Sequence, residues 1–299
     1  MKRLFYVFVA FLGITACEPG QDQEMAQRPN IILVITDDQG YGDLGIHGNP
    51  FIRTPVLDSL ALRSTRIDPF YVCPVCAPTR SSLMTGRYHL RTGVYDTYNG
   101  GAMMAAEEVT VAEVLAANGY HTAMVGKWHL GDSYPLRPMD QGFQYSLAHK
   151  GGGIGQPGDD FGNYIRPDSS YFDPYLWENG VRVRRQGYCS DIFTDQAIQF
   201  MRGHKNHRET DPFFLYLSYN APHNPIQPPE TYLHKVTSRE KNITEDRAGI
   251  VAMIEHLDAN IGRVIAALEQ AGLIDNTIII FASDNGGALN FAAGNGPLR

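Results

Sequence analysis

The chain has 299 residues, of which 43% are hydrophobic and 19% are charged, a composition typical of folded water-soluble proteins that excludes intrinsic disorder. Its length allows one large domain, or two small ones, with a sizeable core. The formal net charge is −7 at pH 7, and no run of lysines and arginines is long enough to follow a phosphate backbone, so nucleic-acid binding is not expected.

The first residues, MKRLFYVFVAFLGITAC, have a basic start, a short apolar run and small residues before Cys17. The apolar run is shorter than the roughly 20 residues that span a bilayer, so it indicates an export signal. The residues before Cys17 resemble the lipobox of bacterial lipoproteins. We therefore predict a signal peptide over residues 1–16, lipidation of Cys17, a polar tether over residues 17–28, and a periplasmic or outer-membrane location with a lipid anchor. The alternative, a plain secretory signal with an incidental cysteine, also predicts export.

Four apolar runs after residue 29 are predicted to form buried strands. The first, NIILVIT, is a continuous β-branched run of the kind that a parallel sheet buries on both faces. The other three are YHTAMVG, PFFLYLSYN and NTIIIFAS. Helix signals separate these runs, and strands that alternate with helices predict an α/β fold. We expect one domain over residues 29–299, with a mostly parallel central sheet sandwiched by helices.

The segments between the strands carry recognisable helix starts. Thr54 is a predicted N-cap with Pro55 in the first turn, and Thr110 and Ser190 are predicted N-caps of two further helices. The longest helix is predicted over residues 244–272, because its apolar residues recur at spacings of four and three. That stripe consists of Ile250, Ile254, Leu257, Ile261, Val264 and Leu268, whereas His256 and Asp258 are interpreted as surface or second-layer residues rather than ligands.

Polar side chains follow each of the four predicted strands. The carboxyl ends of parallel strands lie at the same edge of a sheet, where α/β proteins bind their ligands. One such pair is weak evidence of a site, but four together predict a common site. The residues concerned are Asp37, Asp38, Lys127, His129, His223, Asp284 and Asn285.

The stretch VCPVCAPTRSSLMTGR places Cys73 and Cys76 at the spacing of a redox pair or of half a zinc site. A thioredoxin-like protein needs none of the strand-end polar residues, and a zinc site needs further ligands that Cys189 alone does not provide. A second motif, GIGQPG, matches the dinucleotide-binding fingerprint. It lacks the preceding strand and the following helix, so we interpret it as a loop over the active site.

Several of these stretches resemble blocks of the formylglycine-dependent sulfatases, in the order of that family. The blocks are NIILVITDDQGYGDLG, CAPTRSSLMTGR with its Cys-x-Pro-x-Arg motif, GKWHLG, APHNP and SDNGG. The resemblance covers about residues 29–299 and implies the alkaline-phosphatase-like fold. The chain departs from the family at Thr79, where serine is usual, and at Arg299, where the family continues into a further sulfate-binding lysine and a C-terminal subdomain. We therefore expect the fold without that subdomain.

The resemblance implies the chemistry as well as the fold. A formylglycine-generating enzyme would oxidise Cys76 to an aldehyde, whose hydrate attacks sulfur with one hydroxyl and expels sulfate with the other. It also implies one Ca²⁺ ion bound by the formylglycine made from Cys76 and by four side chains. Carboxylate and amide oxygens suit Ca²⁺ or Mg²⁺ better than zinc. The four side chains are those of Asp37, Asp38, Asp284 and Asn285.

The same resemblance assigns roles to the remaining strand-end residues. Arg80 would hold the formylglycine, and Lys127 would bind a sulfate oxygen. His129 would take the proton when the sulfo-enzyme breaks down, and His223 would bind the bridging oxygen and protonate the leaving group. The helix start at Pro78 would direct backbone N–H groups toward the anion.

The predicted substrates are carbohydrate or aryl sulfate esters. Two alternatives stay open: a phosphate or phosphonate monoester hydrolase with the same site, and a non-catalytic lipoprotein that binds sulfated glycans. Specificity is expected in the glycine- and aromatic-rich loop over residues 147–180, where His149, Lys150 and Tyr171 are candidates for substrate contact.

Overall fold

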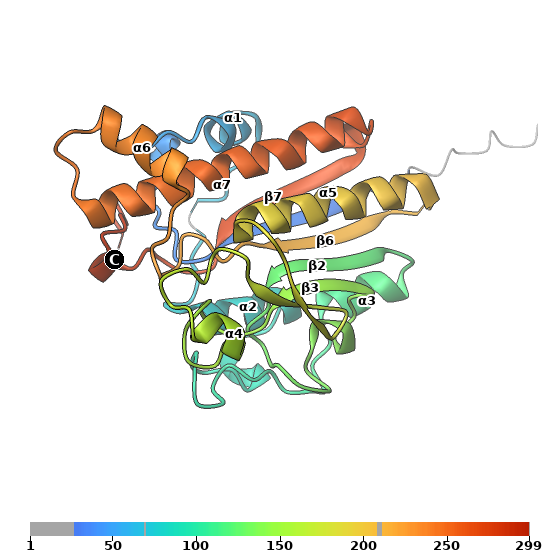
Figure 1. Cartoon of the computed structure of the whole chain (residues 1–299). Coiled ribbons are helices and arrows are strands. Elements are labelled where there is room, and N and C mark those ends of the chain that lie inside the picture. The colour runs from blue at the N-terminus through green and yellow to red at the C-terminus, as the bar shows by residue number, and fades with distance from the viewer. Residues whose placement is uncertain (1–26, 69, 208–210, 299) are drawn as a thin grey trace, which may run out of the picture.

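A computed structural model of the chain describes residues 27–68, 70–207 and 211–298 (Figure 1). The predicted signal peptide, Cys17 and most of the tether lie outside these residues, so they stay predictions. In the part of the chain that is described, no helix has both the length and the apolar character needed to cross a membrane.

Seven strands of the described chain form one sheet, in the order β5-β4-β3-β2-β6-β1-β7. The five strands from β3 to β7 in this order run parallel, while β4 and β5 form an antiparallel hairpin at one edge. The hairpin turn uses Asn179 and Gly180, both with positive φ, as two-residue hairpin turns require. The strands are β1 Asn30–Thr36, β2 His121–Lys127, β3 Tyr145–His149, β4 Tyr175–Glu178, β5 Val181–Arg184, β6 Phe213–Ser218 and β7 Thr277–Ser283.

The four predicted strands are confirmed as β1, β2, β6 and β7, but the expectation of burial is wrong for β7. This strand lies at the sheet edge, where Ile278 is 48% exposed and Ile280 is 46% exposed. Side chains alternate along a strand, so Ile279 and Phe281 pack into the core while the other two point away from it. An apolar run therefore predicted the strand correctly, but not its position in the sheet.

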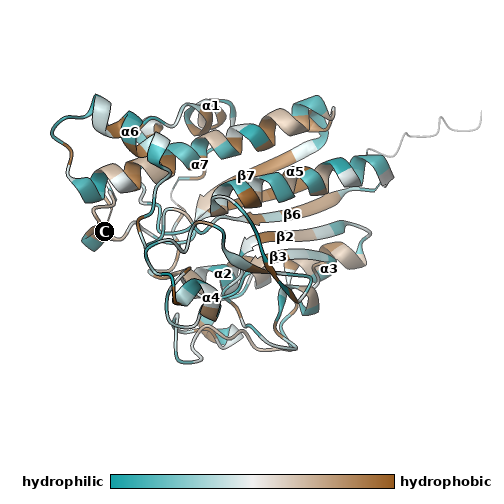
Figure 2. Cartoon of the chain, in the orientation of Figure 1, coloured by the Kyte–Doolittle hydropathy of each residue, from teal (hydrophilic) through white to brown (hydrophobic). Residues whose placement is uncertain are grey.

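Helices cover both faces of the sheet (Figure 1), which confirms the predicted sandwich. One face packs against α1, α5 and α7, and the other packs against α2 and α3. Alternate residues of β1 serve the two cores, with Ile32 on the first face and Leu33 on the second. Figure 2 shows largely apolar strands between helices with hydrophilic outer sides. The helices are α1 Pro55–Arg63, α2 Cys76–Thr85, α3 Val111–Ala117, α4 Phe161–Tyr164, α5 Cys189–His207, α6 Glu230–Arg239 and α7 Glu245–Gln270.

The predicted helix starts fare differently in the structure. Thr110 is the N-cap of α3, as predicted, and it also forms a complete capping box with Glu113. Ser190 is not an N-cap, because α5 begins at Cys189 and Ser190 lies in its first turn. Thr54 occupies the N-cap position of α1, but its side chain makes no capping hydrogen bond.

The first turn of α1 is capped instead by a residue of α7. The carboxylate of Asp258 accepts hydrogen bonds from the backbone N–H groups of Val56 (3.1 Å) and Leu57 (2.8 Å). Asp258 is buried, so it belongs to the second layer rather than to the surface. The predicted apolar stripe of α7 is confirmed, because all six of its residues are buried.

Candidate active site

The strand-end residues predicted from the sequence come together at one edge of the sheet. Adjacent strands β2, β6, β1 and β7 all point their carboxyl ends to the side marked C in Figure 1. Because the strands are parallel, the loops that follow them converge. The structure thus brings Asp37 and Asp38 after β1, Lys127 and His129 at β2, His223 after β6, and Asp284 and Asn285 after β7 to the same edge.

Cys76 joins this cluster from the other side. It is the first residue of α2, with Pro78 in the first turn as predicted, and it is buried. Its Sγ atom and one carboxylate oxygen each of Asp37 and Asp284 all lie within 4.8 Å of one another. Burial raises the pKa of the Cys76 thiol to about 11; the Lys127 ammonium opposes this shift and the two carboxylates add to it. The thiol is therefore protonated at neutral pH, unlike the reactive cysteine of a redox pair.

His129 lies directly against the thiol in a defined tautomer. Its Nε2 atom is 2.9 Å from the carbonyl oxygen of Thr97, so Nε2 carries the proton and donates it to that carbonyl. Its Nδ1 atom is consequently free to accept, and it lies 3.3 Å from Cys76 Sγ. Burial, followed by repulsion from Lys127, holds the pKa of His129 well below its ordinary value. His129 is thus a neutral base that faces residue 76.

Arg80 is fully buried and binds the metal-ligand candidate Asp284. Its Nε and Nη2 atoms donate to Asp284 Oδ2 at 2.9 and 2.7 Å, and Nη1 donates to the carbonyl of Lys127 at 3.0 Å. Ser218 and Tyr216, on the same face of β6, accept further hydrogen bonds from Nη1. Burial opposes a charged guanidinium, but the Asp284 carboxylate outweighs it and raises the pKa of Arg80.

Lys127 forms a second buried ion pair beside the first. Its Nζ atom lies 2.6 Å from Asp37 Oδ2, and neither side chain has any exposed surface. Burial alone would lower the pKa of Lys127, but the Asp37 carboxylate raises it above the ordinary value. The ammonium therefore stays charged next to Cys76.

Two oxygens of the cluster lack a hydrogen-bond partner among the described residues. They are Asp37 Oδ1 and Asn285 Oδ1, and both are buried. Burial and the neighbouring Asp37 carboxylate raise the pKa of Asp284 to about 6, although Arg80 partly offsets this. Buried oxygens are rarely left unpaired, and a group of crowded oxygen donors fits a divalent cation that prefers oxygen ligands.

The backbone around these donors is held in an unusual conformation. Asp38 and His129 both have φ near +59°, a left-handed geometry that side chains with a Cβ seldom adopt. Such conformations cluster at functional sites, where the surrounding structure enforces them. The backbone N–H of Asp38 donates to Asp284 Oδ1 at 3.3 Å. The Oδ1 atom of Asp38 accepts a hydrogen bond of 2.5 Å from Asn285 Nδ2.

His223 completes the site near the surface. Its Nδ1 atom lies 2.7 Å from the carbonyl of Asn224 and therefore donates to it, while Nε2 lies 3.7 Å from Asp38 Oδ2. The side chain is 14% exposed, so Nε2 is the atom available to a substrate. The hydroxyl of Tyr171 contacts the carbonyls of Asn220 (2.6 Å) and His223 (2.7 Å) and so fixes this loop.

The role of residues 147–180 in substrate specificity stays a prediction, and the structure shows where this loop lies. The glycine-rich part lies over the site, because a Cβ at Gly152 would be 2.8 Å from the ring of His129. His149 and Tyr171, two of the candidates for substrate contact, are both buried, and His149 Nε2 lies 3.1 Å from Asp159 Oδ1. Lys150 lies over the ring of Trp177 at 3.3 Å.

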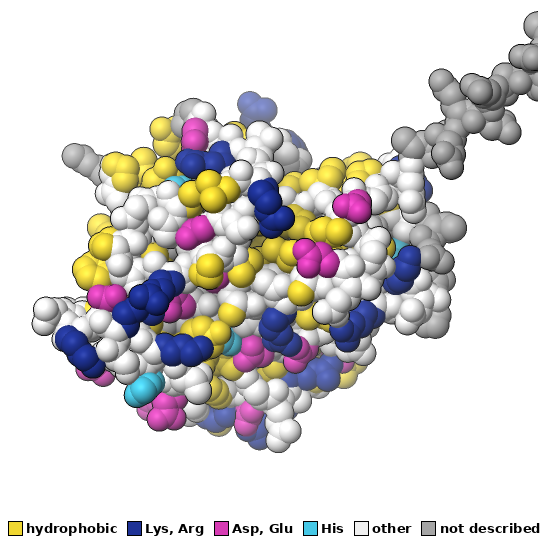
Figure 3. Space-filling model, turned by 90° about the horizontal axis from the view of Figure 1, so that it is seen from above, with side chains coloured by type: hydrophobic (Ala, Val, Ile, Leu, Met, Phe, Trp, Pro, Cys, Tyr) yellow, Lys and Arg dark blue, Asp and Glu magenta, His cyan; other side chains and the backbone are white. Residues whose placement is uncertain are grey.

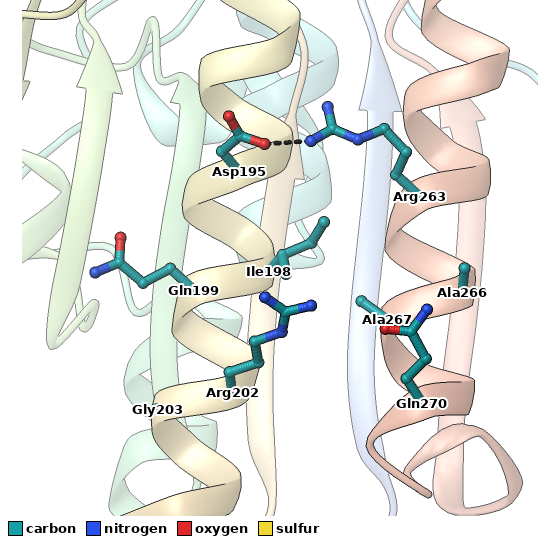
Figure 4. A pocket seen from close by; sticks show the side chains of 9 residues that line it. All are labelled: Asp195, Ile198, Gln199, Arg202, Gly203, Arg263, Ala266, Ala267 and Gln270. Atoms are coloured by element: carbon teal, nitrogen blue, oxygen red, sulfur yellow. Dashed lines mark hydrogen bonds and ion pairs between the residues drawn. The ribbon is translucent and has the colours of Figure 1, made fainter.

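A surface groove between α5 and α7 is separate from this cluster (Figure 4). None of its lining residues is a strand-end residue, and an ion pair between Asp195 and Arg263 bridges the two helices there. On the face of the molecule that Figure 3 shows, basic and acidic side chains are interspersed. The groove is lined by Asp195, Ile198, Gln199, Arg202, Gly203, Arg263, Ala266, Ala267 and Gln270.

Fold and site together define an α/β protein with carboxylates, cations and a thiol gathered at the carboxyl edge of a parallel sheet. Comparison with known proteins agrees with this class. The family model described as Sulfatase matches residues 29–298, so the chain belongs to the sulfatase family. The predicted family and its alkaline-phosphatase-like fold are confirmed.

Individual relatives support the same assignment. The chain is 34% identical to arylsulfatase J of Mus musculus, over 91% of this chain and 45% of that protein. It is 32% identical to N-acetylgalactosamine-6-sulfatase of Mus musculus, over 91% of this chain and 54% of that protein. A crystal structure of Ps i-CgsB in complex with k-i-k-neocarrahexaose superposes with a TM-score of 0.80 at 33% identity, covering 91% of this chain and 61% of the other. The chain thus spans about half the length of the curated relatives it matches.

Proposed function

We propose that the protein hydrolyses sulfate esters of carbohydrates. The observation that carries this proposal is the surroundings of Cys76. Its sulfur lies at a helix start, within 4.8 Å of two carboxylates and 3.3 Å from the unprotonated nitrogen of His129. The names of the relatives add support, because one is an N-acetylgalactosamine-6-sulfatase and the structure of another is a complex with k-i-k-neocarrahexaose.

We propose further that Cys76 is converted to formylglycine by a formylglycine-generating enzyme. This aldehyde, as its hydrate, would supply the hydroxyl that attacks sulfur and the one that later expels sulfate. The raised pKa of the thiol argues against the unmodified cysteine as the nucleophile, because a buried and protonated thiol is a poor one. His129 Nδ1 would accept the proton of a hydroxyl on residue 76, since it already faces that position.

We propose that the strand-end oxygens hold one Ca²⁺ ion. Asp37, Asp38 and Asp284 bring three negative charges, whereas Arg80 and Lys127 bring two positive charges. The site as it stands would therefore repel a sulfate ester, and a divalent cation would reverse the sign of its charge. Asp37 Oδ1 and Asn285 Oδ1, which lack a hydrogen-bond partner among the described residues, would be among its ligands, and the ion would stabilise charge on the sulfate oxygens.

The remaining residues bind and orient the substrate. Lys127 Nζ, fixed against Asp37, provides a buried positive charge for a sulfate oxygen. His223 directs Nε2 toward the opening and, when protonated, would donate to the bridging oxygen as the alcohol leaves. Arg80 acts through Asp284, whose carboxylate it holds with two hydrogen bonds. Export and a lipid anchor at Cys17 would place this chemistry outside the cytoplasm.

Turnover of matched esters tests the proposal. The full chain is co-expressed with a formylglycine-generating enzyme and assayed with nitrophenyl sulfate, nitrophenyl phosphate, a phosphonate monoester and a sulfated oligosaccharide, each with Ca²⁺ or with chelator. We expect sulfate release that depends on Ca²⁺. Preferential turnover of the phosphorus esters would favour the alternative hydrolase, and glycan binding with no release of sulfate would favour a non-catalytic binder.

A further inference from the structure

An ion pair between two residues that are not proposed metal ligands connects the two loops that carry those ligands. We infer that the ion pair between Asp43 and Arg247 is a clamp that sets the position of these loops and thereby the affinity for the cation. Both residues are positioning residues, because neither belongs to the donor set. The inference rests on the metal site of the proposed function.

Asp43 belongs to the loop that follows Asp38 and is fully buried. Its backbone N–H donates to the carbonyl of Gly40 at 2.9 Å, and its carbonyl accepts from Gln39 Nε2 at 3.1 Å. These bonds make residues 39–43 a compact turn that directly follows Asp37 and Asp38, the first two proposed metal ligands. The carboxylate of Asp43 points out of this turn toward another part of the chain.

Arg247, in the first turn of α7, receives that carboxylate. Its Nη2 atom lies 2.6 Å from Asp43 Oδ1, and its Nη1 atom donates to the carbonyl of Ala292 at 3.1 Å. Asp43 Oδ2 in turn accepts from the backbone N–H of Gly294 at 2.8 Å. The pair therefore binds the turn of residues 39–43 and the segment of residues 292–294 to one helix end.

The segment of residues 292–295 is hydrogen-bonded to the loop that carries Asp284 and Asn285, the other two proposed metal ligands. Asn295 accepts from the N–H of Gly287 at 2.7 Å and donates to its carbonyl at 3.0 Å. Gly287 directly follows the loop of Asp284 and Asn285. The ion pair is thus connected by short hydrogen bonds to both donor loops, which are the loop of Asp37 and Asp38 and the loop of Asp284 and Asn285.

The backbones of these segments pack directly against one another. A Cβ at Gly40 would lie 2.2 Å from the carbonyl oxygen of Gly294, and a Cβ at Gly287 would lie 3.0 Å from the Cα of Gly40. Without side chains between them, a shift of one segment displaces the others. Loss of the ion pair would therefore change the spacing of Asp38 and Asn285, which come from different strands.

The chain offers a matched control for the test. Arg239 of α6 pairs with Glu255 of α7 at 2.6 Å and donates to a backbone carbonyl, that of Phe51, at 2.9 Å. The exposed fractions of its side chains, 16% and 8%, are close to the 15% and 0% of Arg247 and Asp43. The two pairs are alike in chemistry, but only Arg247 reaches the donor loops.

The experiment compares Arg247→Met with Arg239→Met by calorimetric titration with CaCl₂ and by thermal unfolding in chelator. We expect Arg247→Met to weaken Ca²⁺ binding at least about tenfold, the lower end of the effect of residues that orient metal ligands. Arg239→Met should stay within about twofold of the unsubstituted chain, although both variants lower the unfolding temperature. Arg247→Lys should recover part of the affinity.

An equal loss of affinity in both variants, or no loss in Arg247→Met, would overturn the clamp. If Arg247→Met does not fold, Asp43→Asn provides the measurement, because it removes the charge and keeps an acceptor for Gly294; unchanged affinity there would overturn the inference equally. Failure of the unsubstituted chain to bind Ca²⁺ is a different result, since it would reject the proposed metal site itself.

Discussion

The strand-end site and the contact between α1 and α7 each bury an aspartate whose pKa is raised to about 6. Burial is the main cause in both places. At the helix contact, both oxygens of Asp258 accept backbone hydrogen bonds, from Val56 and Leu57. At the strand ends, by contrast, Asp37 Oδ1 and Asn285 Oδ1 are buried without a hydrogen-bond partner within residues 27–68, 70–207 and 211–298.

This difference separates a structural contact from a functional site as a whole, because Asp284 itself also accepts hydrogen bonds on both oxygens, from the Asp38 N–H and from Arg80. A buried acid with a shifted pKa is found at both places, so the shift alone does not identify a site. The α1–α7 contact is complete as it stands, and we assign it to stability. The strand-end site has buried oxygen atoms without hydrogen-bond partners, which is the property expected of residues that bind a ligand.

The largest expected effect comes from removing the group at residue 76. Cys76→Ala should lower sulfate release by about a thousandfold or more, because it removes the precursor of the nucleophile. Its free energy of unfolding should change little, since the thiol only fills a small buried volume. Steady-state kinetics of the co-expressed proteins measures this, with Asp258→Asn as the control. Comparable loss of activity in Asp258→Asn would erase the distinction between the two regions.

The second prediction compares the same substitution, aspartate to asparagine, at Asp284 and at Asp258. Asp284→Asn removes the carboxylate that binds Arg80 most closely and leaves only Asp37, at 3.7 Å, as a charged partner. It should therefore cost about 3–5 kcal/mol of stability in chelator and abolish stabilisation by Ca²⁺. Asp258→Asn removes one capping acceptor and should cost about 1–2 kcal/mol while the response to Ca²⁺ persists. Urea unfolding with and without CaCl₂ distinguishes the two. A Ca²⁺ response that survives in Asp284→Asn would place the ion elsewhere.

The third prediction concerns pH. The pKa of Asp284 is raised from 3.8 to about 6 in the folded protein, so the folded state binds its proton more tightly than the unfolded chain does. In chelator, this contribution to stability is present below about pH 4 and is lost as the pH rises through about 6. Ca²⁺ competes with that proton, so stabilisation by Ca²⁺ should grow over the same range. Unfolding temperatures measured from pH 4 to 8 test this; a Ca²⁺ effect independent of pH would contradict it.

The smallest expected effect is that of Tyr171→Phe. Loss of one hydroxyl frees the carbonyls of Asn220 and His223, and a hydrogen bond worth about 0.5–1.5 kcal/mol corresponds to roughly a two- to tenfold decrease in kcat. The affinity for Ca²⁺ should fall by less than kcat, because Tyr171 contacts the His223 loop. Among the described residues, this loop reaches Asp37 only through a backbone hydrogen bond from the Asp37 N–H to Ala221, and it reaches Asp38 through the 3.7 Å contact of His223. A loss of Ca²⁺ affinity larger than the loss in kcat would contradict this.

The comparison also explains what the sequence could predict. The strands β1, β6 and β7 were predictable because each is a continuous apolar run, and β2 was predictable from a weaker run. The polar residues after these strands were predictable as one site because parallel strands end together. The capping box of Thr110 was predictable because all its atoms lie within four residues. These features depend on local sequence.

Features that depend on distant contacts were not predictable. Asp258 caps a helix start 202 residues away, so the sequence around Thr54 gave no sign of it. The tautomer of His129 depends on the carbonyl of Thr97, and the burial of Tyr171 depends on the loop after β6. The strands β3, β4 and β5 are short and mixed in composition, so periodicity did not reveal them.

The chemical state of residue 76 tests the central claim most directly. Mass spectrometry of the proteolytic peptide that contains Cys76, taken from protein made in its native host, should show loss of the sulfur atom and gain of a carbonyl oxygen. The peptide that contains Cys189 should keep its thiol in the same digest. An intact thiol at Cys76 in that protein would contradict the account.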